Sequence, residues 1–128
     1  MVKKSQSKIL IVEDDNFLAD IYKTKLELEG YKVLLTSDGE KGLKIIQTKK
    51  PDLVLLDVLL PKLDGFAILE IIKKEDSVVK EVPIILLTNL GQKEEVQKGL
   101  RLGAADYLIK AHFKPAEVIE KIKKILNK

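Results

Sequence analysis

The chain carries the stretch KILIVEDD at residues 8–15, an apolar run that ends in three acidic residues. A second run of this kind, DLVLLD, lies at residues 52–57, and a third, VPIILLT, at residues 82–88. Nearly unbroken apolar strands are typical of parallel sheets, because both faces of such sheets are covered. The less uniform segments 31–35 and 105–109 fit strands nearer the edges of the same sheet.

Amphipathic stretches separate these apolar runs and predict five helices. In the first helix Phe17, Ile21 and Leu28 share one apolar face. In the fourth, Val96 and Leu100 are expected to point inward. The alternation of strand and helix, repeated five times, predicts an α/β fold with a doubly wound parallel sheet.

Local signals predict where the other helices begin. Ser37 with Glu40 three residues on is a capping-box pattern at the start of the second helix. The third is expected over residues 64–74. Pro115 suits the first turn of the last helix, since proline at that position loses no helical hydrogen bond.

Length and composition bound the class of protein. With 128 residues the chain fits one domain, 1–128, whose core we expect at about 7–127. It has no cysteine, which excludes disulfides, thiol catalysis and cysteine-ligated metals. No apolar stretch approaches the roughly 20 residues that cross a bilayer, and the polar start lacks a signal-peptide core. A cytoplasmic location without membrane contact is therefore the default expectation.

The net charge of +3 does not by itself predict nucleic-acid binding. Lysines are spread over most helices and are mixed with glutamates, a pattern typical of a solvated surface. The clearest basic group, at residues 121–128, suits a helix C-terminus, and no aromatic residues interleave with it to stack on bases. We expect no direct contact with nucleic acid.

Polar residues stand at the ends of several predicted strands. In open parallel sheets, function gathers beyond the carboxyl ends of the strands. If the first and third strands are neighbours, their terminal acids converge within a few ångströms. The strand-end residues are Glu13, Asp14 and Asp15 after the first strand, Asp57 after the third, Thr88 and Asn89 after the fourth, and Lys110 after the fifth.

Carboxylates so close together repel, and a hard divalent cation relieves that repulsion. Magnesium binds such groups and shares oxygens with phosphoryl groups, while Lys110 and the Thr88 hydroxyl could each hold a phosphoryl oxygen. Asp57 is central and is the best candidate nucleophile. Each residue also has a plain structural interpretation: Asp14 or Asp15 could cap the first helix, and a lone lysine is usually solvated.

The strand-end residues and the segments around them form a set of motifs that matches a known family. The sequence resembles the receiver domain of two-component response regulators, over about residues 7–127. The segments that carry the resemblance are 9–15, 55–57 with 60–65, 83–88, 103–108, and Lys110. Together they imply a flavodoxin-like (βα)5 fold with strand order 2-1-3-4-5 and a signalling switch rather than an enzyme.

The resemblance also implies a role for each residue of the site. Asp57 would accept a phosphoryl group from a sensor histidine kinase or a phosphotransfer protein. The expected Mg²⁺ ligands, which could also hold Mn²⁺, are Glu13, Asp14, Asp57 and the backbone carbonyl of Leu59. Lys110 and Thr88 would bind phosphoryl oxygens.

In that family the response spreads from the site to a surface. Thr88 would move toward the phosphoryl group and Tyr107 would turn inward. This change would reshape the face formed by the fourth helix, fifth strand and fifth helix. That face would bind a downstream protein and could support a homodimer.

Two departures from the family pattern affect the loops around the site. Ala111 follows Lys110 where the family usually has a cis proline, so residues 110–115 are expected to be reshaped. Asn89 follows Thr88 where a smaller residue is commoner, which predicts narrower access to the site.

A third departure concerns the lifetime of the phosphorylated form. Leu59 and Leu90 stand two residues beyond Asp57 and Thr88, at positions that influence attack by water in this family. Two apolar side chains there predict slow hydrolysis and a long-lived signal.

Several functional alternatives remain. The chain could be a stand-alone switch, or the receiver half of a DNA-binding transcriptional regulator. Its last helix ends naturally at residues 126–128, which favours a complete protein or a clean boundary. A flavin-binding domain would need a phosphate loop where this chain has acids, and an aspartyl phosphohydrolase would need an acid at Leu59. His112, the only histidine, is expected in a surface loop.

Overall fold

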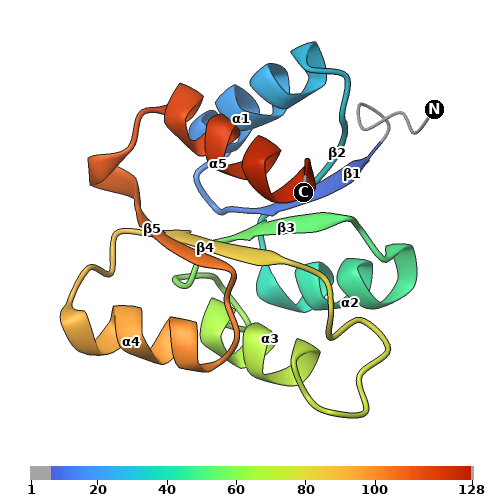
Figure 1. The fold of residues 1–128 in the computed structure, drawn as a ribbon, viewed down its shortest axis with the longest axis vertical. Coiled ribbons are helices and arrows are strands. Elements are labelled where there is room, and N and C mark those ends of the chain that lie inside the picture. The colour runs from blue at the N-terminus through green and yellow to red at the C-terminus, as the bar shows by residue number, and fades with distance from the viewer. Residues whose placement is uncertain (1–6, 128) are drawn as a thin grey trace.

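A computed structural model describes residues 7–127, so the predicted bounds 1–128 extend beyond the described part. Strands and helices alternate along the chain (Figure 1). The elements are β1 (Lys8–Val12), α1 (Asn16–Leu28), β2 (Lys32–Thr36), α2 (Gly39–Lys49), β3 (Leu53–Leu56), α3 (Gly65–Ile72), β4 (Ile84–Thr88), α4 (Lys93–Arg101), β5 (Asp106–Ile109), the 3₁₀ helix η2 (Lys110–His112) and α5 (Pro115–Leu126).

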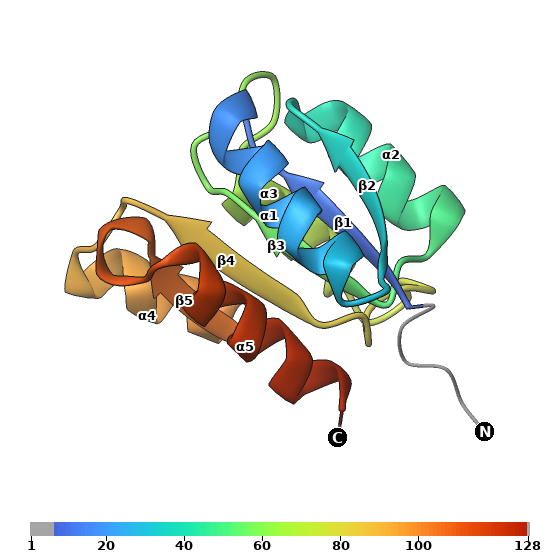
Figure 2. The same cartoon turned by 90° about the horizontal axis from the view of Figure 1, so that it is seen from above.

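The five strands form one parallel sheet in the order β2-β1-β3-β4-β5. This confirms the expected doubly wound, flavodoxin-like fold and strand order. All carboxyl ends therefore lie along one edge of the sheet, as the arrowheads in Figure 2 show. The less uniform strands β2 and β5 are the two edge strands, as predicted.

Helices cover both faces of the sheet. In Figure 1, α1 and α5 lie over one face, and α2, α3 and α4 lie over the other. Apolar side chains fill each layer, and alternate residues of the central strands point into opposite layers: Ile9 and Ile11 toward α1 and α5, Leu10 and Val12 toward α2 and α3. None of the helices within residues 7–127 is long and apolar enough to cross a membrane.

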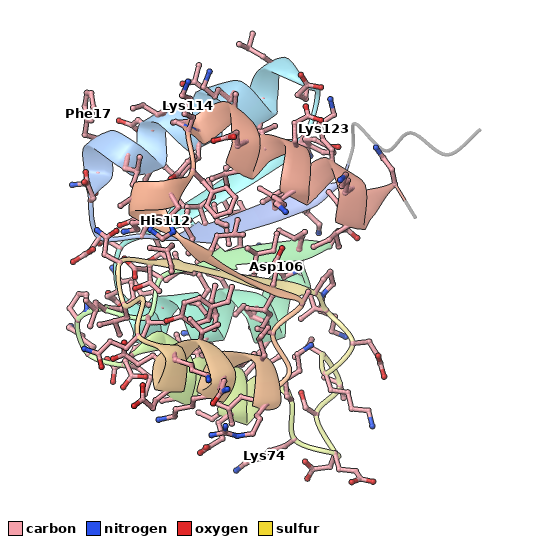
Figure 3. All side chains as sticks on the ribbon, turned by 60° about the vertical axis from the view of Figure 1, so that its left-hand side comes forward. Phe17, Lys74, Asp106, His112, Lys114 and Lys123 are labelled. Carbon is pink, nitrogen blue, oxygen red and sulfur yellow. The ribbon has the colours of Figure 1, made fainter. Side chains whose placement is uncertain are left out.

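The apolar face shared by Phe17, Ile21 and Leu28 is not the buried face of α1. Phe17 is 78% exposed and Leu28 is 81% exposed, and Figure 3 shows Phe17 projecting away from the domain. The buried residues of α1 are Ala19, Tyr22 and Leu26, spaced three and four apart. The small Ala19 and the amphipathic Tyr22 carry a weaker apolar signal than phenylalanine and leucine, which is why the pattern pointed to the opposite face.

Two smaller predictions also need correction. Asp38, not Ser37, caps α2, because its Oδ1 accepts a hydrogen bond of 2.8 Å from the backbone N–H of Lys41. Leu100 on α4 is exposed, although Val96 packs against the core as expected. Pro115 occupies the first turn of α5, as predicted.

The loop after β3 folds closely back on the strand end. Gly65 begins α3, and a Cβ on it would lie 2.3 Å from the backbone oxygen of Asp57. Its N–H donates to the Val58 carbonyl at 2.9 Å. Only glycine permits this approach, so residues 58–64 remain close to the carboxyl edge of the sheet.

Candidate functional site

The pairing of β1 with β3 brings two acids together at the carboxyl edge. Val12 and Leu56 are partners in the register, and Glu13 and Asp57 follow them directly. Glu13 is 3% exposed and Asp57 is 4% exposed. Two carboxylates of this burial need a positive charge or protons, because an unpaired buried charge is costly.

Lys110 supplies that charge. It directly follows Ile109, the last residue of β5. Its Nζ donates to Asp57 Oδ2 at 2.7 Å and lies 2.8 Å from Glu13 Oε1. We call Glu13, Asp57 and Lys110 the acid–lysine cluster.

Backbone groups complete the hydrogen bonding of the cluster. Asp57 Oδ1 accepts from the N–H of Leu59 at 3.2 Å, and Glu13 Oε2 accepts from the N–H of Asp15 at 3.0 Å. Asp15 in turn caps α1 through its side chain, so it is the acid that plays the capping role expected of Asp14 or Asp15.

Burial and the neighbouring charges together set the pKa values of Glu13 and Lys110. Burial raises the pKa of Glu13, and the charge of Asp57 raises it further, whereas hydrogen bonds from Lys110 and Asp15 only partly offset this. For Lys110, burial alone would lower the pKa, but the hydrogen bonds to Asp57 and Glu13 outweigh it and the pKa is raised. The lysine therefore stays charged while the acids compete for it.

The same acids could hold a metal ion. Oxygens of Glu13, Asp14 and Asp57 lie within 4.8 Å of one another, and Asp14 is exposed to solvent. An all-oxygen carboxylate set suits a hard divalent cation, which keeps water among its ligands. The donor set therefore fits the expected ion, with Asp14 on the open side.

A second group of residues links the end of β4 to Tyr107, which lies within β5. The hydroxyl of Thr88, which is fully buried, accepts from the N–H of Leu90 at 3.3 Å. The hydroxyl of Tyr107 donates to the carbonyl of the same residue, Leu90, at 2.5 Å. We call Thr88, Leu90 and Tyr107 the threonine–tyrosine link.

The sequence alone did not point to the backbone of Leu90 as a shared partner. The side chain of Leu90 is apolar, and its N–H and carbonyl are groups that every residue except proline has. No pattern of residue types could reveal this contact.

Ala111 stands where the family usually has a proline, and it lies in the short 3₁₀ helix η2, which is followed by Phe113 in extended backbone. Lys110 begins η2 and still reaches both acids of the cluster. His112 is exposed, as expected, and Figure 3 shows it on the segment that connects β5 to α5.

Comparisons with known proteins agree on one family. The family model for the response regulator receiver domain matches residues 9–123. The chain is 40% identical to the probable transcriptional regulator ycf27 of Cyanophora paradoxa over 124 residues, which are 97% of this chain and 50% of that protein. It is also 40% identical to the alkaline phosphatase synthesis transcriptional regulatory protein PhoP of Bacillus subtilis (strain 168), over 94% of this chain and 49% of PhoP.

Solved structures give the same result. The receiver domain of the Francisella response regulator 1452 aligns with a TM-score of 0.87 and 32% identity, covering 95% of this chain and 98% of that one. A CheY-like receiver domain protein from Methanospirillum hungatei aligns with a TM-score of 0.86 and 33% identity, over 95% and 94% of the two chains. The chain spans about half the length of the curated relatives it matches.

Proposed function

The chain belongs to the response regulator receiver domain family, and from this we propose that it is a switch phosphorylated on Asp57. The observation that carries the proposal is the acid–lysine cluster, in which Lys110 Nζ contacts both buried carboxylates. Asp57 accepts hydrogen bonds from Lys110 and from the backbone N–H of Leu59, and Glu13 accepts a similar pair from Lys110 and Asp15. Asp57 is proposed as the acceptor because it directly follows the central strand β3, at the position that matches the family motif.

In this proposal the phosphoryl group comes from a phosphohistidine of a sensor kinase or phosphotransfer protein. The P–N bond of the donor breaks, and a P–O bond forms to a carboxylate oxygen of Asp57. Lys110 would hold a phosphoryl oxygen by its positive charge, and Thr88 would turn its hydroxyl toward another. The domain thus assists transfer to, and hydrolysis from, its own side chain without acting on another substrate.

Glu13, Asp14 and Asp57 would hold Mg²⁺, with Mn²⁺ as a substitute and the Leu59 carbonyl as a further predicted ligand. The ion would supply positive charge that neutralises the acids and the incoming phosphoryl group. Asp14 is exposed, so it can turn toward the ion without breaking a buried contact.

Intact mass after treatment with acetyl phosphate and Mg²⁺ tests the site. We expect wild type to gain one phosphoryl group and Asp57→Ala to gain none. Asp52→Ala is the matched control, because Asp52 precedes the same strand at its opposite end, where it accepts from the N–H of Lys8. A phosphoryl group that persists in Asp57→Ala would refute the assignment.

The lifetime of the phosphorylated form is a further part of the proposal. Leu59 is 54% exposed beside Asp57, and neither it nor Leu90 can orient a water by its side chain. We expect slow hydrolysis, and Leu59→Asn should shorten the lifetime. A lifetime of seconds in wild type, or no change in the variant, would contradict this.

A second proposal concerns the output. Relatives named as transcriptional regulators are about twice as long as the matched region, which favours a receiver that controls an attached DNA-binding segment. The alternative is a stand-alone switch in the cytoplasm that binds a separate protein through α4, β5 and α5 and makes no nucleic-acid contact of its own. The genomic reading frame beyond Lys128 distinguishes the two, because a helix-turn-helix segment there would establish the first.

A further inference from the structure

The side chain of Tyr107 lies inside the domain. It is 8% exposed and belongs to the core layer that faces α3 and α4. Burial, followed by the charges of Glu95 and Asp57, raises the pKa of its phenol to about 12. The Tyr107 ring therefore holds the inward position that the family resemblance assigns to the phosphorylated state.

Space for the ring comes from Gly99, a buried residue in the last turn of α4. A Cβ on Gly99 would lie 2.8 Å from Cδ2 and 3.0 Å from Cε2 of Tyr107, and 2.7 Å from Cδ1 of Leu86. Carbon atoms do not approach so closely, so any larger residue requires one of these neighbours to move. Glycine is otherwise unfavourable inside a helix, which makes its presence here informative.

We propose that Gly99 is the positioning residue for Tyr107: the slot it leaves, together with the carbonyl of Leu90, holds the ring inward before phosphorylation. The position of Tyr107 is therefore set before phosphorylation, and only Thr88 still has to move when the phosphoryl group arrives. Tyr107 is held at its ring by shape and at its hydroxyl by a hydrogen bond, and neither contact involves the acid–lysine cluster.

The Leu90 backbone connects this position to the phosphorylation site. Thr88 must give up its bond to the Leu90 N–H when its hydroxyl turns toward a phosphoryl oxygen, while Tyr107 keeps the Leu90 carbonyl. This consequence for signalling rests on the proposed phosphorylation of Asp57. The inward position of Tyr107 does not.

Nitration with tetranitromethane, followed by peptide mass mapping, measures which tyrosines are accessible. The chain has three tyrosines, and Tyr22 and Tyr31 are buried in the opposite core layer, so they report on the integrity of the fold. In unphosphorylated wild type we expect all three to be protected. In Gly99→Ala we expect Tyr107 alone to lose protection and react nearly as fast as a free tyrosine amide.

Gln97→Ala is the matched control, because Gln97 is an exposed position on the same helix and its replacement should leave all three tyrosines protected. The proposal is overturned if Tyr107 is freely nitrated in wild type, or if it stays protected in a folded Gly99→Ala protein. If all three tyrosines react in Gly99→Ala, the fold is lost. In that case the double variant Leu86→Val/Gly99→Ala, which removes the contact with Leu86, is tested in its place. The proposal then requires that Tyr107 alone lose its protection from nitration.

Repeating the nitration after acetyl phosphate and Mg²⁺ separates this inference from the proposed function. Once intact mass shows that the protein has gained a phosphoryl group, the protection of Tyr107 from nitration in wild type should be unchanged. Protection that is gained only on phosphorylation would overturn the inference. If no phosphoryl group is gained, the proposed function fails, and the unphosphorylated samples still decide the role of Gly99.

Discussion

The acid–lysine cluster and the threonine–tyrosine link lie at the same edge of the sheet but are held by different forces. Lys110 balances two buried charges over distances of 2.7–2.8 Å. Thr88 and Tyr107 are joined by neutral hydrogen bonds to one backbone residue, and the Tyr107 ring fits against Gly99. The first region should respond to ions and protons, and the second to changes of shape.

Of the changes that distinguish the two regions, removing Lys110 should have the largest effect on stability. Lys110→Met leaves two buried carboxylates without their cation, and we expect a loss of about 3–5 kcal/mol in the free energy of unfolding at pH 7. Urea denaturation without divalent ions measures it. Lys123→Met is the control, because Lys123 pairs with the exposed Glu29 and Glu120 and should matter much less. Equal losses would mean that buried charge does not hold the cluster.

Magnesium should act on the first region next most strongly. An ion that binds only the folded state raises the free energy of unfolding by about 2.7 kcal/mol at one hundred times its dissociation constant. We expect this gain in wild type and its loss in Asp14→Asn. Asp20→Asn, an exposed acid on α1, should keep it. A gain of the same size in Asp14→Asn would remove that residue from the proposed ligands.

The second region should show a smaller effect that is independent of ions. Tyr107→Phe removes the bond to the Leu90 carbonyl and should cost about 1 kcal/mol in the free energy of unfolding. Tyr31→Phe should cost less, because within residues 7–127 no hydrogen bond is assigned to the Tyr31 hydroxyl. If Mg²⁺ changed the cost of Tyr107→Phe, the two regions would be more strongly coupled than we propose.

The pH dependence of the cluster should be the smallest of these effects. The pKa of Glu13 is raised in the folded state, mainly by burial, so the folded protein holds this proton more tightly than the unfolded chain. The resulting stabilisation is complete below the unfolded pKa and is lost as pH rises through the folded pKa. As the pH rises from 4, in the absence of metal, the free energy of unfolding of wild type should therefore fall relative to that of Glu13→Gln. A shift in its favour would contradict the raised pKa.

The strand-end part of the site could be predicted because topology brings it together. Once the strands are parallel and β1 pairs with β3, residues directly after Val12 and Leu56 must be neighbours. Glu13 and Asp57 are such residues, and Lys110 follows β5 in the same way. The approach of Glu13 to Asp57 therefore needs no knowledge of side-chain packing, whereas β4 separates β5 and Lys110 from β3.

Helix faces were harder to predict. The apolar residues Phe17 and Leu28 indicated the inward side of α1, but the sheet buries Ala19, Tyr22 and Leu26 instead. Which stripe of a helix packs inward depends on the angle and height at which it crosses the sheet. Residue types alone do not specify that geometry when apolar residues lie on more than one side.

By itself the amino-acid sequence determined the order of strands and helices, the parallel sheet and the acids at its edge, because these follow from periodicity and from where apolar runs stop. Only the tertiary structure decided that Lys110 lies between Glu13 and Asp57, that Leu90 serves Thr88 and Tyr107 through its backbone, and that Gly99 makes room for the ring. The physical reason is distance. Contacts of a few ångströms between side chains far apart in the chain depend on how complete layers pack, and a sequence pattern reports only on its neighbours along the chain.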